Sequence, residues 1–348
     1  MSTRRPIACI VPPELLKRVA LEGDTDERRA AIETISLDSS IRQARAEISA
    51  RRPPEQRAMG SLLLAHGEPN RVIHDLNHAM SGLGKVLRAE GQRKTKDPGV
   101  NEAYDGLGAT YEMFSDAFSR NSIDGAGMAL HAFVHFGTNY NNAFWDGQQM
   151  LFGDGDGVLF LSFTRSLDVI GHELAHGVTQ FEASLVYSGQ SGALNESMSD
   201  VFGSLVKQHS KKQTADKADW LIGADCVGPK LQVALRSMKE PGTANEYDNQ
   251  PSTMDGYVRT TEDNGGVHTN SGIPNHAFYL AATTLGGHAW EAAGRIWYDA
   301  LRDPRIRPNS GFRSFANATV RQASSLYGAG SAEASAVSDG WKAVKVLS

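Results

Sequence analysis

The stretch "DVIGHELAHGVTQ", residues 168–180, places two histidines four residues apart, with a glutamate directly after the first. Residues four apart lie on one face of a helix, so the imidazoles of His172 and His176 can converge on one metal ion. Glu173 then projects beside that ion. The alternative is a chance match on the polar face of an ordinary helix. The motif alone therefore indicates a zinc site without establishing one.

A second pair of acidic residues follows in "NESMSD", residues 195–200, where Glu196 and Asp200 are again four apart. A catalytic zinc takes three protein ligands and keeps a fourth position for water, so Glu196 is the predicted third ligand. Asp200 is then placed to accept a hydrogen bond from the second nitrogen of a ligand histidine. With these ligands assigned, Glu173 becomes the candidate general base. The alternative is a solvated acidic helix face, although the small residues around the pair favour close packing.

The composition narrows the class of protein. The chain has 348 residues, 35 basic and 40 acidic side chains and a net charge of -5, which does not favour a nucleic-acid or anionic-membrane partner. Its length exceeds the usual size of one compact core, so either two lobes or one domain with an appendage is expected. No apolar run approaches the roughly 20 residues that a membrane span needs. The first apolar run stops after five residues at Pro12, which predicts the absence of a classical export signal.

Residues 1 to about 50 contain two charged, helix-prone pieces, and "RRPPEQR", residues 51–57, has the composition of an exposed linker. Two interpretations are open, a flexible extension and a removable pro-segment. Residues 60–100 and 127–163 indicate strands and turns, whereas 101–120 and most of the chain after 167 indicate helices. The Gly-Asp repeat at 153–157 favours a hairpin turn over a calcium loop.

Several motifs together resemble the thermolysin family of zinc metalloendopeptidases: "HELAHGVTQ", "GALNESMSD", "YNNAFWDG" and "DNGGVHTNSGIPN". The resemblance implies an α+β, two-lobed thermolysin-like (gluzincin) fold, with a strand-rich N-terminal lobe, a helical C-terminal lobe and the HExxH helix between them. "CIVPPELL" resembles the short propeptide of the protealysin-like branch. The expected divisions are a propeptide at 1–55, ending between 45 and 70, and catalytic lobes at 56–182 and 183–348.

The resemblance also implies roles that the residues alone do not establish. His268 would stabilise the oxyanion, Asp263 would orient His268, and Tyr187 would support it. Asn142, the backbone of Ala143 and Arg236 would hold the main chain of the substrate. The apolar pocket after the scissile bond implies cleavage before bulky hydrophobic residues. Its expected walls are Phe160, Phe163, Val169, Ile222, Cys226 and Leu235.

The calcium positions depart from the family pattern. Asp168 and Asp219 match acids of the family's double calcium site, but Lys207, Leu221 and Ala224 stand where acids are expected, and Val233 replaces an acid of another site. The ammonium of Lys207 can neutralise the remaining carboxylates as an ion would. One catalytic zinc and loss of the double calcium site are therefore expected.

Cys9 has two interpretations. Its thiolate could take the fourth position on zinc and keep a precursor silent, as a cysteine switch. Alternatively, it is a small apolar residue that helps an N-terminal strand to pack.

The leading hypothesis is a neutral zinc endopeptidase made as a zymogen, acting as a monomer on protein and peptide substrates, with its own propeptide as inhibitor. It would be cytoplasmic at synthesis and secreted by a leaderless route. An aminopeptidase is the alternative within enzymes, and an inactive relative that presents a binding surface is the alternative outside them. If the protein were an inactive relative, Glu173, Tyr187 or His268 would be expected to be lost. All three are present.

Overall fold

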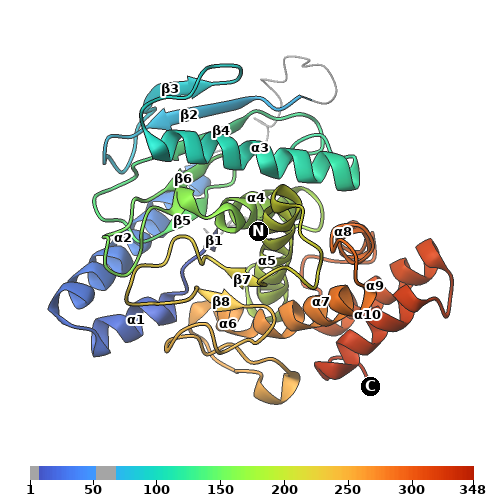
Figure 1. Ribbon diagram of the computed structural model, residues 1–348. Helices are drawn as coiled ribbons and strands as arrows, with labels where there is room; N and C mark the ends of the chain where they lie inside the picture. The colour runs from blue at the N-terminus through green and yellow to red at the C-terminus, as the bar shows by residue number, and fades with distance from the viewer. Residues whose placement is uncertain (1–7, 52–67) are drawn as a thin grey trace.

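The computed structural model describes residues 8–51 and 68–348 (Figure 1). The predicted linker at 51–57 lies, after Arg51, outside the described residues, as does most of the expected cleavage region. Among the described helices, none is long and apolar enough to cross a membrane.

The N-terminal segment is folded against the rest of the chain. It contains strand β1 (Ala8–Cys9) and helices α1 (Pro13–Glu22) and α2 (Thr25–Arg51). Proline stands at the first position of α1, where its missing N–H costs no hydrogen bond. Leu15, Leu16 and Val19 recur at helical spacing and are buried in the main core. This burial contradicts the interpretation of a flexible extension.

The N-terminal lobe is built on a sheet. Within the described residues, six strands join in the order β1-β5-β6-β4-β2-β3. β2 is parallel to β4 and β4 to β6, and the other pairs are antiparallel. Helix α3 (Pro98–Phe118) lies across this lobe as predicted (Figure 1). The remaining strands are β2 (Arg71–Asp75), β3 (Lys85–Ala89), β4 (Leu130–Val134), β5 (Ala143–Trp145) and β6 (Met150–Phe152).

One strand prediction is wrong. Residues 158–163 form only an isolated bridge, between Phe160 and Val227, and a short 3-10 helix follows at Phe163–Arg165. The Gly-Asp repeat is a turn but not a hairpin. Asp156 Oδ1 accepts hydrogen bonds from the N–H groups of Val158 and Leu159, both at 2.8 Å. These local bonds turn the chain away from β6, so no second strand pairs there.

The C-terminal lobe is helical, as predicted, and α4 (Leu167–Phe181) lies between the two lobes (Figure 1). A short two-stranded ribbon, β7 (Leu221–Ile222) with β8 (Arg236–Ser237), interrupts the helices of the described region. The other helices are α5 (Gly189–Lys211), α6 (Asp263–Asn270), α7 (Gly272–Leu285), α8 (Ala293–Leu301), α9 (Phe312–Tyr327) and α10 (Ala332–Ala343).

Helices α4 and α5 approach each other closely at two glycines. A Cβ at Gly203 would lie 2.3 Å from the carbonyl oxygen of Asp168, and one at Gly171 would lie 3.0 Å from Gly203 Cα. Only residues without a side chain permit this approach. It brings the histidines of α4 to the acidic residues of α5.

Candidate active site

The predicted zinc ligands meet in the buried space between α4 and α5. The Nε2 atoms of His172 and His176 are 3.0 Å apart. The Glu196 carboxylate lies 3.5 Å from each of these nitrogens, through Oε2 and Oε1 respectively. His172, Glu173 and His176 also bring their ligand atoms within 4.8 Å of one another. The structure therefore brings together all four residues of the predicted zinc constellation.

Hydrogen bonds fix the orientation of both imidazoles. His172 Nδ1 lies 2.8 Å from Asp200 Oδ1, as predicted, and His176 Nδ1 lies 2.8 Å from Asn195 Oδ1. With each Nδ1–H donating to an oxygen, each Nε2 presents a lone pair to the other. Burial lowers the pKa of His176 to about 4, which keeps the ring neutral at pH 7.

This donor set fits a divalent cation. Two facing lone pairs at 3.0 Å repel each other unless a cation lies near them. Glu196 Oε2 and Glu173 Oε1 are buried, and neither has a hydrogen-bond partner among the described residues. Two neutral imidazoles and a carboxylate are ligands that zinc takes in catalytic sites.

Asp200 is itself held by two further residues besides His172. Arg236 donates to both of its oxygens at 2.7 Å, through Nε and Nη2, and Asn275 Nδ2 donates to Oδ2 at 2.7 Å. Burial alone would raise the pKa of Asp200, but the Arg236 charge outweighs it and keeps this pKa below its ordinary value. Asn275 is the last residue of the motif "DNGGVHTNSGIPN", but its contact with Asp200 was not predicted, because that contact depends on how the segment after His268 packs against α5.

The predicted general base is oriented by β5. Glu173 Oε2 accepts the backbone N–H of Trp145 at 2.9 Å. Burial and the nearby Glu196 carboxylate raise the pKa of Glu173 well above 4.5. A raised pKa brings a carboxylate closer to the value that suits proton transfer at neutral pH.

The residues assigned to oxyanion stabilisation also converge. Asp263 Oδ1 lies 2.7 Å from His268 Nδ1, and Tyr187 Oη lies 3.2 Å from His268 Nε2. Burial opposes protonation of His268, but Asp263 and Glu196 raise its pKa to about 10. His268 is therefore a cationic donor at neutral pH.

The N-terminal strand occupies the cleft beside these residues. His268 Nε2 lies 2.9 Å from the carbonyl oxygen of Cys9. The Ile10 N–H donates to the Ala143 carbonyl at 3.3 Å, and Arg236 Nη1 donates to the Ile10 carbonyl at 3.0 Å. The Val11 N–H donates to Asn142 Oδ1 at 3.1 Å. Asn142, Ala143 and Arg236, which were predicted to hold a substrate main chain, thus hold residues 10 and 11.

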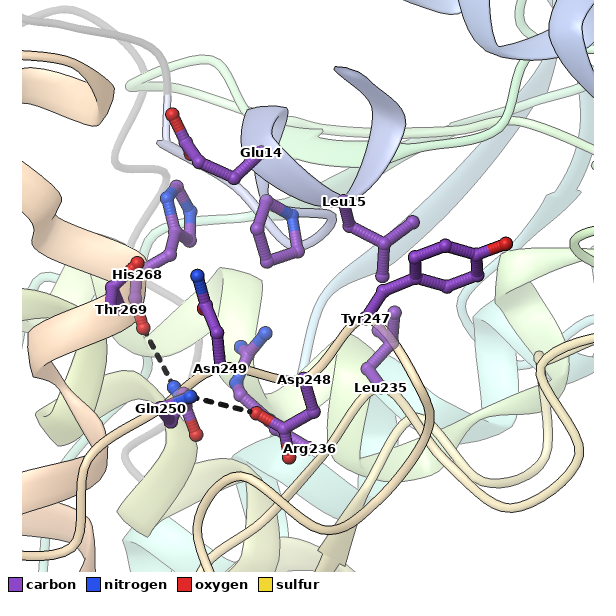
Figure 2. Close-up of a pocket in the computed structure, with 11 residues that line it drawn as sticks. Glu14, Leu15, Leu235, Arg236, Tyr247, Asp248, Asn249, Gln250, His268 and Thr269 are labelled. Carbon is purple, nitrogen blue, oxygen red and sulfur yellow. Dashed lines mark hydrogen bonds between the residues drawn. The ribbon is translucent and has the colours of Figure 1, made fainter. Parts of the chain in front are cut away.

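Helix α1 closes the same cleft. Figure 2 shows Glu14 and Leu15 of α1 facing Leu235, Tyr247 and His268, and the cavity that remains between them is only about 20 Å³. Gln250 Nε2 donates to the His268 carbonyl at 2.7 Å, which ties the cleft wall to α6.

The predicted pocket walls are all buried in the main core, and Ile10 belongs to the same cluster. These residues are Phe160, Phe163, Val169, Ile222, Cys226 and Leu235. Cys226 and Cys9 are both buried, and no disulfide joins them.

Cys9 packs in a smaller cluster with aromatic residues that include Phe136 and Phe144. It is not among the described side chains whose ligand atoms lie within 4.8 Å of one another at the zinc site. Its main-chain carbonyl, rather than its thiol, meets His268. These contacts favour the interpretation of Cys9 as a packing residue, and the cysteine switch stays a prediction.

Lys207 stands between the two acids that the sequence assigned to a former calcium site. Its Nζ lies 2.8 Å from Asp168 Oδ2 and 2.8 Å from Asp219 Oδ1, and it donates to the Leu221 carbonyl at 2.6 Å. The Lys207 side chain is only 2% exposed. The ammonium thus contacts both carboxylates, as expected.

Comparisons with known proteins agree with this geometry. The thermolysin metallopeptidase catalytic domain matches residues 73–180, and the thermolysin metallopeptidase alpha-helical domain matches residues 183–346. An extracellular metalloprotease of Pectobacterium carotovorum subsp. carotovorum is 49% identical over 93% of this chain and 92% of its own length. Protease PrtS of Photorhabdus sp. (strain Az29) is 48% identical over 80% of this chain and 76% of its own.

Among solved structures, the precursor of protealysin, a metalloproteinase from Serratia proteamaculans, has a TM-score of 0.86 and 47% identity, and the match covers 98% of this chain and 100% of that one. Both lobes and the N-terminal segment thus have counterparts in known metalloproteases. The chain belongs to the thermolysin family of zinc metalloendopeptidases.

Proposed function

We propose that this enzyme holds its zinc through His172, His176 and Glu196 and cleaves internal peptide bonds before bulky hydrophobic residues. The observation that carries the ligand assignment is the convergence of two oriented imidazoles and one buried carboxylate. A bound zinc ion would supply Lewis-acid activation of water at neutral pH.

The remaining steps fall to side chains of this chain. Glu173 takes a proton from the attacking water and passes it to the leaving amine, and Trp145 holds its carboxylate in place. His268, kept cationic by Asp263, donates to the oxyanion, and Tyr187 adds a second donor. Asn142, Ala143 and Arg236 bind the substrate main chain.

A peptide library tests this activity and its specificity. The protein activated from the full chain should cut before Leu, Ile, Phe and Val, and phenanthroline should abolish the cutting. Cleavage confined to free amino termini would favour the aminopeptidase alternative. Cutting that survives the chelator would contradict the metal mechanism.

We further propose that residues 8–51 are part of a propeptide that inhibits the enzyme. The segment contacts both lobes: Lys17 forms an ion pair with Glu262, and Arg18 lies 5.1 Å from the centre of the Tyr247 ring. On the other lobe, Asp38 accepts from Tyr140 Oη at 2.5 Å and from Asn142 Nδ2 at 3.2 Å. A segment that engages both walls and fills the cleft excludes substrate.

Asp38→Ala in the full chain tests this docking. Loss of two hydrogen bonds to a buried carboxylate should speed activation of the full chain by roughly tenfold. Asp26→Ala is the matched control, because the Asp26 side chain is exposed and, among the described residues, its carboxylate pairs with Arg29 of the same segment. Equal activation of both variants would contradict a role of Asp38 in inhibition.

We also propose that the double calcium site is lost, with the Lys207 ammonium in its place.

We propose further that the enzyme acts as a monomer, since one chain supplies both walls of the cleft. An extracellular site of action is supported by the Pectobacterium relative, which is an extracellular metalloprotease.

A further inference from the structure

We infer that the Cys9–Ile10 peptide bond occupies the position of the bond to be cut, so that the released pro-segment is an inhibitor which the mature enzyme destroys by hydrolysing that bond. This inference rests on the proposed function and assigns one substrate of the same site.

The register of the strand locates the bond. The carbonyl of Cys9 meets His268 Nε2 at 2.9 Å, and the N–H of Ile10 meets the Ala143 carbonyl at 3.3 Å. Both polar groups of this one peptide unit are therefore bound by residues proposed to bind substrate. The acceptor carbonyl lies at the oxyanion donor, because His268 Nε2 is also 3.2 Å from Tyr187 Oη and 3.5 Å from Glu196 Oε2.

The next peptide unit has a different environment. The carbonyl of Ile10 accepts from Arg236, whose charge is already paired with Asp200, and the N–H of Val11 donates to Asn142. These contacts bind the main chain, but the described residues place no second donor such as Tyr187 at the Ile10 carbonyl. Of the two peptide bonds on either side of Ile10, only the one before it faces the catalytic histidine.

The general base lies beside strand β5, on which the pro-segment is docked. β1 pairs with β5 in the register Ala8 to Trp145 and Cys9 to Phe144. Trp145 is also the residue whose N–H binds Glu173 Oε2. Strand β5 thus positions the pro-segment and the general base together.

Hydrolysis at this position needs only water. The water oxygen bonds to the carbonyl carbon of Cys9 and the C–N bond to Ile10 breaks, while Glu173 transfers the water proton to the Ile10 nitrogen. The products are a carboxylate on Cys9 and an amine on Ile10. Ile10 is the bulky apolar residue that the proposed specificity requires, and its side chain is fully buried in the main core, to which the predicted pocket walls also belong.

In the docked precursor, the two products of a cut would stay bound to the enzyme. Helix α1 begins at Pro13, two residues after Val11, and is tied to the C-terminal lobe through Lys17 and Glu262. On the other side of the bond, Cys9 is held by the pairing of β1 with β5. Both new ends are therefore kept near each other after a cut, which favours resealing. Cutting should be slow in the docked precursor and should go to completion on a short peptide without this anchor.

The test uses the peptide PIACIVPPELL, residues 6–16, with the protein activated from the full chain, and identifies the products by mass spectrometry. Five residues of this peptide satisfy the hydrophobic rule, namely Ile7, Ile10, Val11, Leu15 and Leu16. Cutting only before Ile10 therefore reports the register. The expected fragments are residues 6–9 and 10–16.

The control is an unrelated library peptide with a bulky hydrophobic residue. If the control is cut and PIACIVPPELL stays intact or is cut elsewhere, this inference is overturned while the proposed function stands. If neither peptide is cut, the proposed function fails instead.

A second measurement does not depend on catalysis. Binding of the peptide to chelator-treated protein is measured by calorimetry, with N-methylation at Ile10 or at Val11. Removing either N–H should weaken binding roughly fivefold or more, because each loses one main-chain hydrogen bond. Unchanged binding for both peptides would overturn the register.

Discussion

At the scale of single residues, the zinc constellation depends on local spacing and could be predicted from the sequence. His172 and His176 are one helical turn apart, as are Glu196 and Asp200, so each pair is set by its own helix. The partners across the fold could not be predicted in the same way. Trp145 and Asn275 reach Glu173 and Asp200 only because distant segments pack together.

Lys207→Met tests the buried ion pair between Lys207 and Asp168 and, with it, the proposed loss of the double calcium site. The substitution keeps the side-chain volume but leaves Asp168 buried without its cation, so the free energy of unfolding should fall by about 3–5 kcal/mol. Urea unfolding at pH 7 measures it, with Glu173→Gln as the background to prevent self-digestion. In the same background with Lys207 intact, EGTA should leave the melting temperature unchanged. A lower melting temperature in EGTA would show that calcium still binds.

At the scale of elements, the helices were predictable because their apolar residues recur at helical spacing, as in α3. The structure of residues 158–163 could not be predicted, because a short apolar run is equally consistent with a strand and with a buried loop. Asp156 decides between them by capping the turn with its side chain. The docking of β1 on β5 was also beyond the sequence, since two residues carry no periodicity.

Gly203→Ala tests the crossing of α4 and α5. Its new Cβ would lie 2.3 Å from the Asp168 carbonyl, so the helices must separate. The overpacking should cost about 1–3 kcal/mol of stability and weaken zinc binding, because Glu196 moves away from His172. Competition with a fluorescent zinc chelator measures the affinity. Ser197→Ala, on the same helix, is the control. The Ser197 hydroxyl has no hydrogen-bond partner within the described part of the chain, so its removal should leave the affinity unchanged.

His135→Gln tests the junction of β4, α3 and the Gly-Asp turn. His135 lies 2.9 Å from Asp154 and 2.9 Å from Asp97, the N-cap of α3. Asp154 and Asp97 raise the pKa of His135 to about 9, against partial burial. A raised pKa stabilises the fold fully below pH 6.5, and this contribution is lost as the pH rises through 9.

The stability difference between wild type and His135→Gln, both in the Glu173→Gln background, should therefore be at most about 3 kcal/mol at pH 6 and should vanish near pH 10. Urea unfolding across this range checks it. A difference that stays constant with pH would mean that the charge of His135 contributes nothing.

At the scale of the whole molecule, the chain is an enzyme with its own first segment in the cleft. The two-lobed architecture followed from the order of strands and helices together with the motifs. The substrate-like position of Cys9 and Ile10 did not, because it depends on contacts with His268 and Arg236, more than 200 residues away. Sequence reasoning identified Cys9 by its thiol, whereas the structure engages its carbonyl.

The central claim is that Glu173 acts as general base beside a zinc ion held by His172, His176 and Glu196. The most direct test measures zinc content and peptidase activity of Glu173→Gln together, with the wild-type and variant chains cut in the linker by the same added protease, which is then removed. The account predicts one zinc per chain in both proteins and a loss of kcat/KM of roughly 10²–10⁴-fold in the variant. Full activity in the variant, or zinc lost along with the activity, would contradict it.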